Sequence, residues 1–401
     1  MAVRTQQRAP YRRSNPSQTG PFTPQFPLDL VMLEPNLIIP ADDQKLLQCL
    51  LDHHGKLTPS PDSQHALSNL NNRICEILDN IIVNPSIFES GQLDHVRSVG
   101  SFKLNTWLNG SCISDLACVF RTLPTLEAVQ NLASFVRRQL TSNNSPAEHV
   151  NSKVELESYG FSVASGDYMV QVLITTTPMN LNRTSPDIHI SLTAQKIALA
   201  SIRHLRWAEE NATHTTVKVL IRILKDFRRR FRGFAYMNSW LIDLLAHYVV
   251  MNNPSRQPLP LNHAFRRVFH LLASGFLLPS STGLIDPCEQ GNVRLHSLMS
   301  LAEQDEICCT AQVLLRILNY GGYSSLFTHS DLDAASREQL LKVSTKSIDN
   351  LSILEWPEPV ALHSQQITEN GNGLPNSNHH RLLRIDIAKH HLLGTASVEI
   401  I

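Results

Sequence analysis

The stretch VGSFKLNTWLNGSCISDLACVFR, residues Val99–Arg121, decides how the first half of this chain folds. A Gly-Ser pair stands at Gly100–Ser101, and a polar loop that contains glycine follows it. The run from Asp115 to Phe120 is apolar after its first residue, which predicts a short strand. The order therefore predicts a helix or turn, the Gly-Ser pair, a loop and a strand.

This order resembles the signature of the nucleotidyltransferase superfamily, in which Gly-Ser cradles a triphosphate and Asp-x-Asp at the start of a strand holds metal. Phosphoryl transfer uses two Mg²⁺ ions about 4 Å apart, which clamp the attacking and leaving oxygens. Mg²⁺ takes oxygen ligands and needs several carboxylates, and residues two apart on a strand share a face. Asp115 holds the second position of the pair, but the first is Ile113, whose side chain cannot bind Mg²⁺.

A further pair of strands bears on the same site. Residues Tyr159–Ser165 and Asp167–Thr177 predict two strands joined at Gly166, the second rich in β-branched residues. In the superfamily a third metal carboxylate comes from such a strand, just before a Val-Leu pair, and here that position is Gln171. With two of three metal carboxylates replaced, we expect a pseudo-nucleotidyltransferase that has no catalytic residues, no metal and no cofactor.

Bulk composition sets wide limits on the function. The chain has 401 residues, 35 basic and 35 acidic, so its formal net charge is zero. This balance gives no overall electrostatic reason to bind nucleic acid, which leaves local patches or a partner. Seven cysteines without framework spacing predict reduced thiols in the cytosol or nucleus. No apolar run approaches ~18 residues, and the N-terminus lacks the apolar core of a secretory signal.

Periodicity divides the chain into four parts. Residues 1–25 predict a disordered basic arm, with a weak electrostatic arm for RNA as the functional alternative. Residues 26–192 predict a mixed α/β lobe, residues 193–328 a mainly helical lobe, and residues 329–401 a mostly disordered tail. Helices are expected at Asp42–His53, Pro61–Asn84, Thr125–Leu140, Thr193–Asn211, Thr215–Phe231, Ser239–Met251, Leu261–Gly275 and Gln304–Tyr320. The fold class is therefore α+β.

The helix expected at Thr215–Phe231 carries a basic stripe beside an apolar one, with Thr215 as its expected N-cap. The basic stripe consists of Lys218, Arg222, Lys225 and Arg229, at steps of four, three and four residues. One interpretation is a solvated face on a core helix. The other is a cationic wall that attracts triphosphate or RNA backbone.

The histidines do not predict a metal site. His204, His214, His247 and His263 are far apart in the sequence, with no cysteine or carboxylate at ligand spacing. We therefore expect no zinc. Cys308 and Cys309 fall on a predicted helix and point to different faces, so core packing is the expected role.

Residues from about Phe26 to Thr328 together resemble the DZF domain. The resemblance rests on five stretches: Leu123–Val129, Ile202–Trp207, Thr216–Arg222, Met251–Pro258 and Ile285–Glu289. DZF domains in turn resemble the 2′-5′-oligoadenylate synthetase branch of nucleotidyltransferases. That resemblance implies a mixed-sheet lobe followed by a helical lobe.

The second resemblance also assigns vestigial nucleotide-binding residues. Ser101, beside Gly100, takes the place of the phosphate-binding serine, and Asp115 matches one metal ligand. Arg222 and Lys225 match basic residues that contact the triphosphate, whereas Leu104 stands where a loop lysine is expected.

Family resemblance further implies a heterodimer with interleukin enhancer-binding factor 3 or a related DZF protein, which carries the double-stranded RNA-binding domains. The chain would then support RNA processing, transcription and translation in the nucleus, with the cytoplasm as an open alternative and no membrane role. We expect the dimer contact within Val293–Phe327, where Leu298, Leu301, Ile307 and Leu314 could be apolar anchors. The alternative is that these four residues fill the intramolecular core.

Two other functions compete with this one. An active nucleotidyltransferase that adds nucleotides to RNA would need more carboxylates than the pattern supplies. A sequence-specific DNA-binding factor would need a helix-turn-helix, zinc finger or basic zipper, and the sequence has none of these signatures.

Overall fold

A five-stranded mixed sheet is the centre of the first lobe in the computed structural model, which describes residues 43–142, 152–254, 257–319 and 321–328. The strands are β1 (Leu93–Val99), β2 (Ile113–Phe120), β3 (Lys153–Glu157), β4 (Gly160–Ser165) and β5 (Tyr168–Thr176). Their spatial order is β1-β2-β5-β4-β3, in which β2 and β5 are parallel and the other pairs antiparallel. The arm expected at residues 1–25 and the tail expected at residues 329–401 lie outside the described residues.

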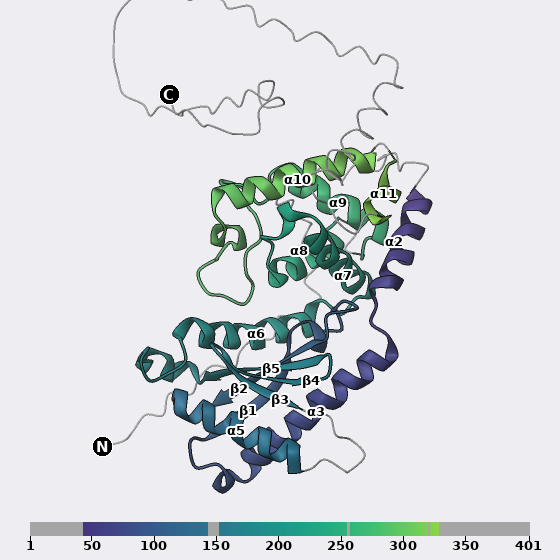
Figure 1. Ribbon diagram of the computed structural model, residues 1–401. Coiled ribbons are helices and arrows are strands. Elements are labelled where there is room, and N and C mark those ends of the chain that lie inside the picture. The colour runs from purple at the N-terminus through teal and green to yellow at the C-terminus, as the bar shows by residue number, and fades with distance from the viewer. Residues whose placement is uncertain (1–42, 143–151, 255–256, 320, 329–401) are drawn as a thin grey trace, which may run out of the picture. The chain divides into compact units, whose positions relative to one another are not determined.

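Helices cover both faces of this sheet (Figure 1). The helices α3 (Pro61–Val83) and α5 (Leu126–Ser142) lie on one face, and α6 (Leu192–Asn211) lies on the other. Alternate residues of β2, namely Leu116, Cys118 and Phe120, point into the core shared with α3 and α5. Since strand residues alternate between faces, Ile113, Asp115 and Ala117 face the side of α6, where Ala117 packs with Leu205.

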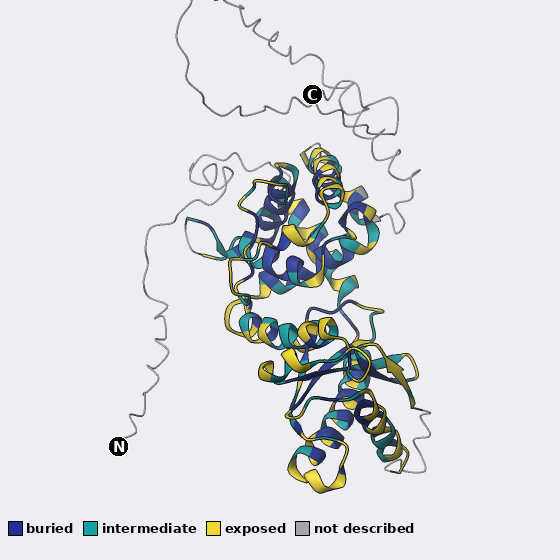
Figure 2. Ribbon diagram, turned by 90° about the vertical axis from the view of Figure 1, so that its left-hand side faces the viewer, coloured by how far each residue is buried: buried dark blue, intermediate teal, exposed yellow. Residues whose placement is uncertain are grey.

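The second lobe is helical around one apolar core. Its helices are α2 (Asp43–Leu57), α7 (Thr215–Arg230), α8 (Ser239–Met251), α9 (Leu261–Ala273), α10 (Leu301–Asn319) and α11 (Tyr323–Thr328). Figure 2 shows buried residues gathered between these helices and along the sheet, while exposed residues line the outer faces. The described residues also form short helical turns, namely η1 (Pro85–Ile87), α4 (Gly100–Lys103), η2 (Pro178–Arg183), η3 (Arg232–Phe234) and η4 (Leu295–Leu298).

Two helices lie in a different lobe from the one their place in the sequence suggested. Helix α2 packs in the helical lobe because Leu46 and Leu50 are fully buried in its core, and Asn262 and Arg266 bind the carboxylate of Asp43. Helix α6 packs on the sheet, where its Leu205 is buried. The expected boundary between residues 192 and 193 therefore does not separate the two lobes.

Local predictions were mostly right at helices and less so at strands. Thr125 caps α5 as expected, since its Oγ1 accepts from the amide of Ala128 at 3.1 Å. His214, and not Thr215, caps α7, because its ring nitrogen accepts from the amide of Thr216. Strands β1 and β3 were not predicted: the sequence analysis expected a helix or turn before the Gly-Ser pair, where β1 lies. None of the described helices is both long and apolar enough to cross a membrane.

Candidate functional site

The Gly-Ser turn is packed directly against Asp115. Gly100 follows β1, whose last residue, Val99, pairs with Asp115 in the antiparallel ladder. The φ of Gly100 is +72°, and a Cβ there would lie 2.6 Å from Oδ2 of Asp115. Glycine is needed because an L side chain is disfavoured at this φ and because the carboxylate occupies the space.

The residues at the three expected metal positions share one face of the sheet. Ile113 and Asp115 are two apart on β2, and Asp115 pairs with Gln171 on the parallel strand β5. The three positions that the sequence resemblance marked as metal ligands therefore lie together in the sheet. Mg²⁺ needs several charged oxygen ligands, and this group offers one carboxylate, one amide and one alkyl chain. This donor set does not fit a Mg²⁺ pair.

The carboxylate of Asp115 is largely removed from solvent. It has no hydrogen-bond partner among the described residues, and burial raises its pKa to about 6. No neighbouring charge among those residues contributes to this shift. The charged form is therefore destabilised in the folded chain.

Replacing Asp115 by asparagine is expected to stabilise the chain near pH 7. The ordinary pKa is 3.8 and the folded value is about 6. Between these values the folded chain binds more protons than the unfolded chain, so stability falls as pH rises from about 4 to 6. The full pKa shift corresponds to about 3 kcal/mol of unfolding free energy lost at neutral pH. Partial exposure of the carboxyl reduces this loss to about 1–2 kcal/mol.

The measurement is urea unfolding of the natural chain and Asp115→Asn at pH 4.5 and 7.5. The increase in unfolding free energy caused by Asp115→Asn should appear at pH 7.5 and largely vanish at pH 4.5. Asp167→Asn, at an exposed turn between β4 and β5, is the matched control and should change little at either pH. Equal pH dependence of Asp115→Asn and the natural chain would refute the assignment.

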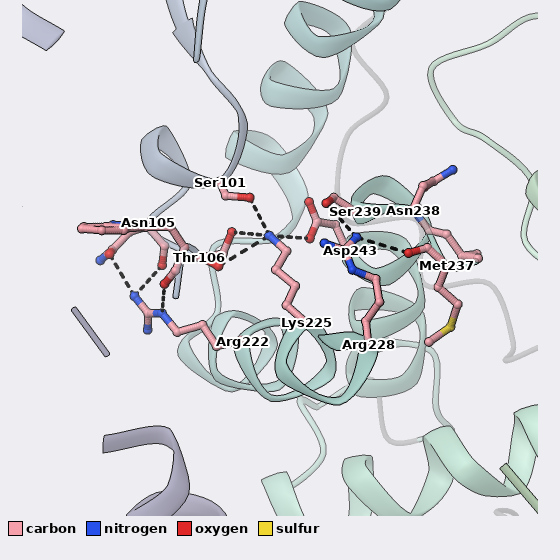
Figure 3. A network of polar contacts seen from close by, with 12 residues as sticks. Ser101, Asn105, Thr106, Arg222, Lys225, Arg228, Met237, Asn238, Ser239 and Asp243 are labelled. Atoms are coloured by element: carbon pink, nitrogen blue, oxygen red, sulfur yellow. Dashed lines mark hydrogen bonds and ion pairs between the residues drawn. The ribbon is translucent and has the colours of Figure 1, made fainter. Parts of the chain in front are cut away.

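The two basic residues of α7 assigned to the triphosphate are buried against the loop after the Gly-Ser pair (Figure 3). Lys225 Nζ donates to Ser101 Oγ at 2.8 Å and to Thr106 Oγ1 at 3.0 Å. It also lies 3.5 Å from Oδ1 of Asp243, an ion pair without hydrogen-bond geometry. Burial lowers the pKa of Lys225 and raises that of Asp243, and each charge partly offsets the shift of the other.

Arg222 is held in the same way. Its Nη2 donates to the carbonyl and side-chain oxygens of Asn105 at 2.8 and 2.9 Å, and its Nε donates to the Trp107 carbonyl. Its Nη1 lies 3.0 Å from a ring nitrogen of His54. The donors of Arg222 and Lys225 therefore already join α7 to residues 101–107. A triphosphate would have to replace these internal contacts.

The basic stripe predicted on α7 splits in the structure. Arg222 and Lys225 are buried, whereas Arg229 is exposed and Lys218 is half-buried. A continuous cationic wall is therefore not formed by these four residues. Leu104, at the position of the expected loop lysine, is partly buried against apolar residues of both lobes.

The four leucine and isoleucine residues proposed for partner binding fall into two pairs. Ile307 and Leu314 are buried in the core of the helical lobe, so the intramolecular alternative is right for them. Their spacing of seven places both on the inner face of α10. Leu298 and Leu301 are 68% and 69% exposed, so they remain available to a partner. Cys308 is buried and Cys309 exposed, which fits the packing role for Cys308 only.

Folding brings one histidine into a group of potential metal ligands that spacing along the sequence did not predict. His204 of α6 lies beside Asp286 and Cys288, although more than eighty residues separate them in the sequence. Spacing along the chain could not reveal this group, because the lobes are brought together only by folding. The Asp-Pro-Cys sequence was the one local signal.

Comparison with known proteins places the chain in a family and a fold. The DZF N-terminal domain matches residues 8–213, and the DZF C-terminal domain matches residues 216–345. Among solved structures, the chain is similar to Escherichia coli MS115-1 CdnC with ATP, at 15% identity and a TM-score of 0.52, over 75% of this chain and 96% of CdnC. It is also similar to Cid1, an RNA terminal uridylyl transferase, at 12% identity and a TM-score of 0.50, over 72% of this chain and all of that one. These similarities show a nucleotidyltransferase-like fold, as the sequence predicted.

Proposed function

The chain belongs to the DZF family, and from that premise we propose that it is a catalytically inactive nucleotidyltransferase-fold subunit. It pairs with a second DZF protein that carries double-stranded RNA-binding domains. One observation carries the inactive assignment: Asp115 shares the metal face of the sheet with Ile113 and Gln171. One carboxylate cannot hold two Mg²⁺ ions or neutralise the charge that develops during transfer.

Within the family, the stretches quoted above resemble the smaller subunit of a nuclear heterodimer, interleukin enhancer-binding factor 2, and this resemblance supports the proposal. Its partner on this proposal is interleukin enhancer-binding factor 3 or a related DZF protein, and RNA binding occurs mainly through that partner. The chain supports RNA processing, transcription and translation by stabilising and positioning the larger subunit. It acts in the nucleus.

Active nucleotide transfer to RNA is the second candidate. The Gly-Ser turn packed on Asp115 favours it, because this part of the signature is retained with its geometry. The carboxylate count and the internal contacts of Arg222 and Lys225 oppose it.

Restoring the replaced carboxylates should restore metal binding. In the natural chain, Mg²⁺ or Mn²⁺ at millimolar concentration should leave the melting temperature unchanged. In Ile113→Asp/Gln171→Asp, three carboxylates repel one another without metal, and Mn²⁺ should stabilise the variant by about 1–3 kcal/mol through binding to the folded state. Thermal unfolding with and without Mn²⁺ measures this.

Ile113→Asn is the control for that experiment, since it adds a polar group but no charge. It should gain no Mn²⁺ response. The inactive assignment fails if the natural chain is itself stabilised by Mn²⁺ and Asp115→Asn abolishes that stabilisation.

Substitution of the two exposed leucines of the helical lobe tests the proposed pairing with a second DZF protein. Leu298→Asp/Leu301→Asp is expected to weaken co-purification with the DZF partner by about 30-fold or more, because two apolar anchors would carry charge into a buried interface. Leu126→Asp, at a 50% exposed position on α5, is the matched control and should leave the complex intact. The same preparations are used to measure how tightly a double-stranded RNA probe binds to the chain alone and to the complex. Equal pairing by both variants would place the dimer contact elsewhere.

A further inference from the structure

Three potential metal ligands from distant parts of the chain meet outside the site described above. They are His204 on α6, and Asp286 and Cys288 on the loop between α9 and η4. Their ligand atoms all lie within 4.8 Å of one another. His204 lies in the stretch matched by the DZF N-terminal domain, and the other two lie in the stretch matched by the DZF C-terminal domain.

The carboxylate of Asp286 is buried and fixed from two sides. Its Oδ1 accepts from the amide of Cys288 at 2.8 Å, and its Oδ2 accepts from Nε1 of Trp240 at 2.9 Å. Its own amide donates to the carbonyl of Val293 at 2.8 Å, which closes the loop next to the bridge between Ile285 and Arg294. Hydrogen bonds of this kind orient a metal-binding carboxylate before the ion arrives.

The ring of His204 is fixed as well. It stacks on Trp240 with a centroid separation of 3.9 Å and an angle of 5° between the planes. Its Nε2 is buried without a hydrogen-bond partner among the described residues and lies 3.8 Å from Oδ2 of Asp286. A buried polar atom without a partner is costly, and a cation between this nitrogen and the carboxylate would satisfy both.

We propose that His204, Asp286 and Cys288 bind one zinc ion, which ties α6 to the loop that follows α9. Imidazole nitrogen, thiolate sulfur and carboxylate oxygen are the ligands zinc prefers. Binding releases the thiol proton of Cys288 to solvent, and the two negative ligands then balance the charge of Zn²⁺. Water would take the fourth position.

The distances suit a zinc ion after a small adjustment. Zinc bonds of about 2.0–2.3 Å in a tetrahedron separate the ligand atoms by about 3.3–3.6 Å. The pair formed by His204 and Asp286 is close to that separation at 3.8 Å. Cys288 must approach by at most about 1.2–1.5 Å. Its sulfur has one weak competing contact, with the Arg203 carbonyl at 3.6 Å.

Such an ion would stabilise the arrangement of the two lobes. Its ligands come from the helix that covers the sheet and from a loop of the helical lobe, and the unfolded chain would not hold them together. Binding to the folded state alone therefore raises stability with zinc concentration. This consequence is independent of the proposed loss of catalysis.

The experiment uses the full chain, stripped with EDTA, dialysed and titrated with Zn²⁺ alone. Elemental analysis should find about one tightly held zinc per chain, and Zn²⁺ should raise the melting temperature. Co²⁺ in place of zinc should give the thiolate charge-transfer and ligand-field absorption of a tetrahedral site. Cys288→Ser and His204→Ala should lose both the zinc and the cobalt spectrum.

Controls separate this site from adventitious binding. Cys309→Ser and His65→Ala change an exposed cysteine and an exposed histidine, and both should bind zinc as the natural chain does. Trp240→Phe keeps a ring against His204 but removes the donor to Asp286, so zinc should bind about 10–100-fold more weakly. Zinc held equally by Cys288→Ser would overturn the proposal, and so would a natural chain that retains no zinc when the excess is dialysed away after the titration.

Discussion

Replacing Lys225 by methionine is expected to lower the free energy of unfolding by about 3–5 kcal/mol, because it removes one partner of a buried ion pair. Methionine fills a similar volume but removes the cation that pairs with the buried carboxylate of Asp243. Ser101 Oγ and Thr106 Oγ1 also lose the donor that joins them to α7. Equilibrium unfolding in urea, with secondary structure followed by circular dichroism, measures the loss.

Two further variants isolate the cause. Arg229→Met alters an exposed cation on the same helix and should change stability by no more than about 0.5 kcal/mol. Lys225→Met/Asp243→Asn should recover at least about 1 kcal/mol, since the amide removes the unpaired charge. Burial raises the pKa of Asp243, so the Lys225→Met deficit should shrink at acid pH as this carboxyl becomes neutral. A small deficit with no pH dependence would contradict the buried-pair account.

Replacing Gly100 by alanine is expected to cost about 2–4 kcal/mol, which is large for the addition of one methyl group. Part of the cost, about 1–2 kcal/mol, comes from placing an L residue at φ +72°. The rest comes from the Cβ, which would lie 2.6 Å from Oδ2 of Asp115. Thermal or urea unfolding gives the total.

Gly110 offers a matched control for this substitution. Its φ is +78°, and a Cβ there would meet nothing within 4 Å. Gly110→Ala should therefore show the backbone cost alone, and its difference from Gly100→Ala measures the contact with Asp115. Gly100→Ala/Asp115→Ala should remove that difference. If the two glycine variants are equally destabilised, the turn is not packed on Asp115 as described.

The Gly-Ser turn takes part in both the Gly100 and the Lys225 contacts. The Gly-Ser turn and the basic residues of α7 are parts of a nucleotide-binding signature, yet each has a structural role in this chain. Gly100 allows β1 to turn over Asp115, and Lys225 holds Ser101 and the loop after it against the helical lobe. The presence of such residues is therefore weak evidence for catalysis, because their structural roles alone account for them.

Much of the fold follows from short-range patterns in the sequence. The apolar stripe of α7, the β-branched run of β5 and the Pro61 start of α3 each predict their element within a few residues, because the local period matches the buried face. The register of β2 against β5 could not be calculated from periodicity. The signature predicted it indirectly, by placing Asp115 and Gln171 at one metal site.

What the sequence could not reveal depends on contacts between distant segments. The leucines of α2 give the same pattern whether the helix packs on the sheet or among α7, α9 and α11. A basic stripe looks the same from sequence whether its cations face solvent or, like Arg222 and Lys225, are buried against a loop more than a hundred residues earlier. The group formed by His204, Asp286 and Cys288 was missed for the same reason.

Strand β3 shows a different limit. Its sequence, Lys-Val-Glu-Leu-Glu, alternates as a strand should, but it is short, mostly exposed and at the edge of the sheet. Local composition of this kind is equally typical of a loop. Pairing with β4 decides the outcome, and that pairing is a property of the whole sheet.

The central claim is that the fold is retained while nucleotide transfer is lost. The most direct test is incorporation of labelled nucleotides into an RNA primer by the purified chain, alone and with the proposed DZF partner, in Mg²⁺ and in Mn²⁺. We expect no incorporation above that of an Asp115→Asn control in any of these conditions. Incorporation by the chain alone that Asp115→Asn abolishes would contradict the claim and make Ile113 and Gln171 members of a working site.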